Sequence, residues 1–159
     1  MTVHHHERSE RRWPTVRAPI GHAVVDLMAQ ADDHLADASS APTAGERYRL
    51  AHLAALRSAA AVLAAQPPDA GARRRRRRGP RSVWVELPLV APDLAEWAAY
   101  FAGTAAKREA VEAGIRGAVE PAEADELLRH SETFRGVAAA HLGLPYQAPL
   151  AGSVSRMVS

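Results

Sequence analysis

The chain has 159 residues, of which 47% are hydrophobic, enough for one folded domain with an apolar core. It contains no cysteine, which excludes disulfides, iron–sulfur clusters and thiol chemistry. No apolar run reaches the roughly 18 residues that span a bilayer, and the first residues lack the apolar region of a signal peptide. We therefore expect a cytoplasmic protein with no membrane segment, no metal site and no cofactor.

The net charge of +2 is divided unevenly along the chain. Residues 20–66 and 83–143 hold 8 basic and 15 acidic residues, whereas residues 67–82 hold 7 basic residues and 1 acidic residue. The candidate body is therefore acidic, and much of the basic charge falls on a loop. Because an acidic surface does not attract phosphate backbones, general affinity for nucleic acid would have to come from the basic segments.

Polar segments on both sides delimit one candidate domain. Residues 1–19 are typical of a disordered basic arm, residues 20–143 of a helical bundle, and residues 144–159 of a disordered tail. Within the bundle, residues 67–82 predict an exposed basic loop, because like charges at this density repel one another. The loop has two interpretations: a tolerated expansion without function, or a nucleic-acid-binding arm. The candidate binding residues are Arg73, Arg74, Arg75, Arg76, Arg77 and Arg78.

The first two helices are predicted by apolar periodicity and by a capping motif. Apolar residues recur with the helical period from Ile20 to Ala38. A second helix is predicted from Glu46 to about Ala65. Thr43 and Glu46 form a capping box, in which the threonine hydroxyl accepts from the Glu46 N–H and Glu46 reaches back to Thr43. The expected buried stripe of this helix consists of Leu50, Leu53, Leu56, Ala60 and Leu63.

The second half of the chain predicts one short helix and two longer ones. Residues 83–87 favour a short helix that Pro88 breaks. One of the longer helices covers residues 92–114, and the other runs from Glu120 to about His141. Each has a proline in its first turn, where the missing N–H costs nothing. Four principal helices with modest connections predict an all-α, up-and-down antiparallel four-helix bundle.

Two pairs of arginine and histidine are candidate catalytic residues. Four residues separate Arg47 from His52, and five separate Arg135 from His141. In RNA cleavage a histidine can transfer protons near neutral pH while an arginine stabilises phosphorane charge, without a metal. These separations turn about 140° and about 240° around a helix, so convergence requires a kink or a dimer cleft. The alternative interpretation is an arginine at a helix end and a partly buried histidine.

Residues 44–63, Ala-Gly-Glu-Arg-Tyr-Arg-Leu-Ala-His-Leu-Ala-Ala-Leu-Arg-Ser-Ala-Ala-Ala-Val-Leu, resemble the second helix of HEPN domains. These domains are small helical bundles named for higher eukaryotes and prokaryotes nucleotide-binding. Residues 94–101, Leu-Ala-Glu-Trp-Ala-Ala-Tyr-Phe, and residues 123–129, Glu-Ala-Asp-Glu-Leu-Leu-Arg, resemble a stand-alone actinobacterial HEPN-like branch. The resemblance covers roughly residues 24–142.

The resemblance implies a four-helix bundle that often forms homodimers. Many HEPN proteins are metal-independent ribonucleases with an Arg-x4–6-His motif, often in toxin or defence systems, whereas others are non-catalytic RNA-binding or accessory modules. We expect a non-catalytic, RNA-associated or accessory interaction module with an RNA or protein partner. One alternative is a metal-independent ribonuclease that uses Arg47 and His52, or Arg135 and His141. Another is a DNA-associated accessory protein that binds through the arginine loop.

Overall fold

The computed structural model describes residues 20–67 and 82–145, and this part of the chain is helical without a strand. The prediction of an all-α fold is therefore confirmed. The basic arm, most of the arginine loop and nearly all of the C-terminal tail lie outside the described residues. The elements are α1 (His22–Ser40), α2 (Ala44–Ala64), α4 (Val83–Val90), the 3-10 turn η1 (Pro92–Leu94), α5 (Ala95–Glu112) and α6 (Pro121–His141).

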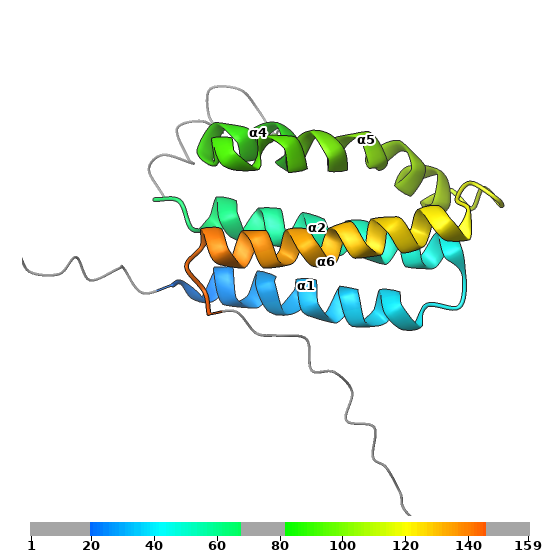
Figure 1. The fold of residues 1–159 in the computed structure, drawn as a ribbon, viewed down its shortest axis with the longest axis horizontal. Coiled ribbons are helices and arrows are strands. Elements are labelled where there is room, and N and C mark those ends of the chain that lie inside the picture. The colour runs from blue at the N-terminus through cyan, green and yellow to red at the C-terminus, as the bar shows by residue number, and fades with distance from the viewer. Residues whose placement is uncertain (1–19, 68–81, 146–159) are drawn as a thin grey trace, which may run out of the picture.

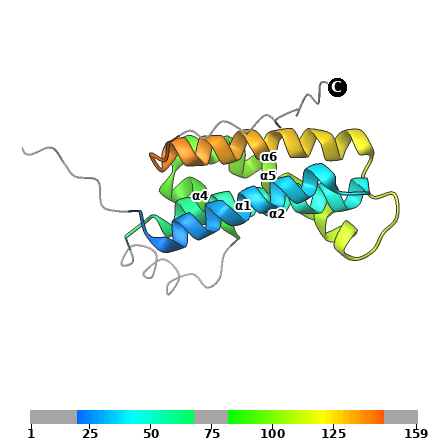
Figure 2. The same cartoon turned by 90° about the horizontal axis from the view of Figure 1, so that it is seen from below.

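Helix α2 is the central element of the described structure. It packs against α1, α4, α5 and α6. Figure 1 shows α2 and α6 side by side, with α1 on one side of them and the layer of α4 and α5 on the other. The long helices α1, α2, α5 and α6 alternate in direction along the chain, as Figures 1 and 2 show.

Alanines, rather than leucines, are the main buried residues of α2. Leu50 is buried, but the other four members of the predicted stripe are only half-buried. The prediction of a single leucine stripe is wrong because it assumes one packed side, whereas α2 has neighbours on several sides. Small side chains allow these neighbours to approach closely. The buried residues of α2 are Tyr48, Leu50, Ala51, His52, Ala54, Ala55, Ser58, Ala59, Ala61 and Val62.

Large rings fill the space between the α4–α5 layer and α6. Phe101 of α5 is fully buried, and its ring centroid lies 5.1 Å from that of Trp84 and 5.2 Å from that of Phe134. Trp97 stacks on Phe101 at 6.1 Å. Aromatic pairs at these separations stabilise the core beyond the area that they bury. These contacts attach α4 and α5 to α6 through side chains.

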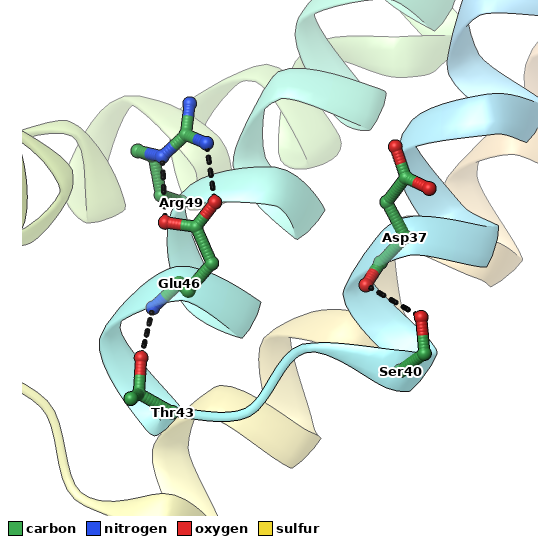
Figure 3. A network of polar contacts seen from close by, with 5 residues as sticks. All are labelled: Asp37, Ser40, Thr43, Glu46 and Arg49. Carbon is green, nitrogen blue, oxygen red and sulfur yellow. Dashed lines mark hydrogen bonds and ion pairs between the residues drawn. The ribbon is translucent and has the colours of Figure 1, made fainter.

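The turn between α1 and α2 contains half of the predicted capping box. The hydroxyl of Thr43 accepts a hydrogen bond from the backbone N–H of Glu46 over 3.2 Å (Figure 3). The carboxylate of Glu46 does not reach back to Thr43. It instead accepts from Arg49, at 2.5 and 3.1 Å, and this contact lowers the pKa of Glu46. On the other side of the turn, the Ser40 hydroxyl donates to the carbonyl oxygen of Asp37 over 3.3 Å.

Helix α4 extends further than the sequence predicts. The sequence predicts that Pro88 ends the helix, but α4 continues through it to Val90. The helix starts at Val83, as predicted. The hydroxyl of Ser82 caps this start by accepting from the N–H of Trp84 over 3.3 Å. Trp84 and Leu87 are buried in the core, and this packing offsets the hydrogen bond that Pro88 cannot donate.

Candidate functional site

Arg47 projects from the first turns of α2 toward α6. Its Nη1 lies 2.5 Å from Oδ1 of Asp125, and its Nη2 donates to the carbonyl oxygen of Ala41 over 3.4 Å. The Arg47 side chain is 25% exposed. The guanidinium therefore connects α2 to α6 instead of facing a free surface.

His52 lies one and a half turns further along α2, inside the core. It is 1% exposed, and the rings of Trp84 and Phe101 approach it edge-on at 5.9 and 6.4 Å. Its Nε2 lies 3.3 Å from the carbonyl oxygen of Phe101. A carbonyl oxygen only accepts, so Nε2 carries the proton and Nδ1 is bare. Nδ1 has no partner among the described residues.

Burial holds His52 in its neutral form. It lowers the pKa of His52 to about 4, and the positive charge of Arg108 contributes to the same shift. At neutral pH the ring is therefore an uncharged imidazole that links α2 to α5. Arg47 and His52 lie on different sides of α2, as the helical turn of about 140° between them requires.

The structure also directs Arg135 and His141 to different neighbours. Nε and Nη2 of Arg135 lie 2.8 and 2.9 Å from the two carboxylate oxygens of Asp32 on α1. Nδ1 of His141 lies 3.3 Å from Oδ2 of Asp93, which belongs to η1. The His141 side chain is 27% exposed, so this imidazole is far more accessible than that of His52.

The predicted nucleic-acid-binding arginines belong to the part of the chain that the structure does not describe. Arg73 to Arg78 lie outside residues 20–67 and 82–145, so their surroundings are not described. Within those two ranges, no group of three or more histidine or acidic side chains is arranged to hold a metal ion. In the same part of the chain, every helix is too short or too polar to cross a bilayer.

Tyr100 pairs with His130, a contact that the sequence does not predict. The Tyr100 hydroxyl lies 2.8 Å from Nδ1 of His130 and connects α5 to α6. Burial raises the pKa of Tyr100, and the nearby carboxylate of Glu126 acts in the same direction. Thirty positions separate the two residues, and no local motif relates them.

Comparison with known families agrees with this helical architecture. A family model described as SAV_6107-like HEPN matches residues 38–138, from the end of α1 to the last turns of α6. The chain therefore belongs to this HEPN family, as its resemblance predicts. The matched range includes Arg47, His52 and Arg135 and ends before His141. No curated protein and no solved structure matches the chain.

Proposed function

We propose that this protein is a non-catalytic, cytoplasmic HEPN-type module that associates with RNA and self-associates. The observation that carries the proposal is the separation of both arginine–histidine pairs. His52 is 1% exposed and bonded to Phe101, while Arg47 is paired with Asp125 on another helix. A base that removes a 2′-OH proton must come within hydrogen-bond reach of its substrate, and the buried imidazole of His52 lacks that access.

The four long helices support a HEPN-type four-helix bundle, to which α4 is an addition. The body remains acidic in this arrangement, so we assign RNA contact to Arg73 to Arg78 rather than to the helices. Such contact would be sequence-independent and sensitive to salt. A partner protein would then supply any specificity for a particular RNA.

A ribonuclease that uses His141 is the second candidate. The observation that favours it is the Asp93 carboxylate beside Nδ1 of an accessible histidine, because an acidic neighbour can hold an imidazole in one orientation. Arg135, its predicted partner, is paired with Asp32 and would have to leave that carboxylate to reach a phosphate.

The two candidates differ in one assay. Labelled single-stranded RNA is incubated with the wild type, His141→Ala and His52→Ala in the presence of a chelator. The proposal expects RNA binding without cleavage by any of the three proteins. Cleavage by the wild type that His141→Ala abolishes, while His52→Ala retains it, would overturn the proposal in favour of the ribonuclease.

The RNA-binding role is tested separately by a variant that lacks residues 73–78. Fluorescence anisotropy across a salt series should show weaker binding and a smaller salt slope for this variant. An unchanged affinity and slope would exclude the arginine loop as the contact.

A further inference from the structure

Helices α5 and α6 end in the same backbone motif but place their apolar residue differently. At the end of α6, Gly143 takes a positive φ of 70°, and the N–H of Leu144 bonds to the carbonyl of Ala139 over 2.9 Å. Leu144 packs against a cluster that includes Val24 and Met28 of α1. This is the usual outcome of a Schellman motif, in which the residue after the glycine covers the end of the helix.

At the end of α5 the apolar residue stays in solvent. Gly114 has φ 77°, and the N–H of Ile115 bonds to the carbonyl of Ala110 over 3.1 Å. Ile115 is nevertheless 59% exposed and belongs to neither apolar cluster of the described residues. The motif therefore fixes the backbone at Ile115 without burying its side chain.

A free cation follows this isoleucine. Arg116 is exposed and makes no ion pair with any residue of the described ranges. Gly117 has φ 71°, so left-handed glycines lie on both sides of the two residues. We call Ile115 and Arg116 the α5 tip. It displays one branched apolar side chain and one guanidinium.

Helix α4 lies at the other end of the molecule. Its exposed apolar residues and its single acidic residue complement the isoleucine and the arginine of the α5 tip. Glu86 is its only charged residue, and a helix that is apolar on all sides is normally buried. Trp84 and Leu87 are buried, but Val85 and Leu89 are 51% and 49% exposed. These two side chains are four residues apart and share one side of the helix. We call Val85, Glu86 and Leu89 the outer face of α4.

We propose that the α5 tip of one copy of this chain docks on the outer face of α4 of a second copy. Ile115 would cover Val85 and Leu89, and Arg116 would pair with Glu86, so apolar character and charge are both complementary. Helix α4 and the C-terminal end of α5 lie at opposite ends of the molecule in Figures 1 and 2, so one copy cannot make the contact within itself.

The contact joins two different surfaces, so it is head-to-tail, and repetition yields chains or closed rings. A contact made by so few side chains is small, which places it among weak, concentration-dependent interfaces. It involves neither the arginine–histidine pairs nor residues 73–78, so its failure would leave the proposed RNA association untouched.

Sedimentation velocity of the full chain over a concentration series tests the proposal. The wild type is expected to form species larger than a dimer as concentration rises. Ile115→Asp and Leu89→Asp should each weaken self-association about tenfold or more, because each removes a central apolar contact. Val25→Asp is the matched control: Val25 is 51% exposed on α1, and its substitution should leave association unchanged.

Mixing the two variants distinguishes a head-to-tail contact from a symmetric one. Ile115→Asp retains an intact α4 face and Leu89→Asp retains an intact tip, so an equimolar mixture should form heterodimers and nothing larger. A symmetric α4–α4 contact would instead leave Ile115→Asp unaffected, which would overturn the proposal. A wild type that stays monomeric up to millimolar concentration would overturn it as well.

The ion pair is tested by exchanging its charges. Arg116→Glu and Glu86→Arg should each weaken association, and the double variant should recover it at least in part. Deletion of residues 73–78 should leave association in place. Loss of association on that deletion would show that the arginine stretch, rather than the α5 tip, makes the contact. Circular dichroism of each variant establishes that the helices are retained.

Discussion

Nε2 of His52 donates a hydrogen bond to the carbonyl oxygen of Phe101 over 3.3 Å and so links α2 to α5 across the core. The bond fixes the tautomer of the imidazole and leaves a bare Nδ1 in apolar surroundings. A proton on Nδ1 would place an unpaired charge inside the core, which is costly. The neutral state of His52 therefore stabilises the folded protein.

Acid should destabilise the protein through His52. The folded pKa of about 4 lies below the usual value of 6.5, so between these values the unfolded chain binds a proton that the folded chain excludes. The stabilising contribution is complete above pH 6.5 and is lost as pH falls toward 4, by on the order of 3 kcal/mol. Urea unfolding of the wild type and of His52→Leu at pH 7 and pH 4.5 measures this contribution.

The Leu variant should lose less stability between these two pH values than the wild type. Phe101 keeps a second donor in that variant, because the Thr104 hydroxyl donates to the same carbonyl over 2.9 Å. Equal losses for both proteins would contradict the assignment, because other titrating groups are shared and cancel in the comparison.

Removing the cap of α2 should reduce stability modestly. Thr43→Ala deletes the acceptor for the Glu46 N–H and is expected to cost about 1 kcal/mol. Ser40→Ala is a suitable control, since its hydroxyl only donates to carbonyls of its own helix. Urea midpoints at an unchanged m-value report the difference. Equal shifts for both variants would argue against the cap.

The aromatic layer should contribute most to stability. Phe101→Ala removes a fully buried ring that contacts Trp84 and Phe134, and we expect a loss of about 3 to 5 kcal/mol. Phe101→Leu keeps most of the volume and should cost clearly less. Near-ultraviolet circular dichroism and thermal unfolding would record both changes. Similar losses of stability for the alanine and leucine variants would contradict this expectation, because they would mean that the surrounding core closes equally well around either side chain.

The ion pair between Arg47 and Asp125 should be worth little despite its short contact. The two side chains are 25% and 50% exposed, and solvent screens a pair of this kind. A double-mutant cycle with Arg47→Ala and Asp125→Ala is expected to give a coupling energy of about 1 kcal/mol or less. A much larger coupling would show that the pair acts as a buried link between α2 and α6.

Gly114→Ala should be more harmful than Gly21→Ala. Gly114 has φ 77°, a conformation that costs an L-residue on the order of 1 kcal/mol, although a Cβ there would meet no atom within 4 Å. Gly21 has an extended backbone and equally open space, so alanine should be tolerated there. Chemical denaturation of both variants separates backbone strain from crowding, and equal stabilities would contradict the strain.

Local signals in the sequence predict the helices well because their causes are local. The Thr43 hydroxyl caps α2 by accepting from the N–H three positions later. The proline in the first turn of α6 favours the start of that helix without a contact to any distant residue. The errors arise where a competing side chain or tertiary packing overrides the local signal. Arg49 takes the carboxylate of Glu46 from the capping box, and the packing of Trp84 and Leu87 carries α4 past Pro88.

The candidate sites depend almost entirely on distant groups. Helix periodicity correctly predicts that Arg47 and His52 point apart, but it cannot identify Asp125 and Phe101 as their partners. These partners come from α6 and α5, 78 and 49 positions away. Such pairings follow from the packing of the whole domain and have no periodic signature.

The central position of α2 also has a kinetic consequence. Three residues connect α1 to α2, so these helices can pair through a short loop, whereas the contact of Arg47 with Asp125 closes a span of 78 positions. We expect the α1–α2 hairpin to form in the folding transition state and α6 to dock after it. Substitutions between α1 and α2 should then slow folding, and substitutions between α2 and α6 should mainly accelerate unfolding.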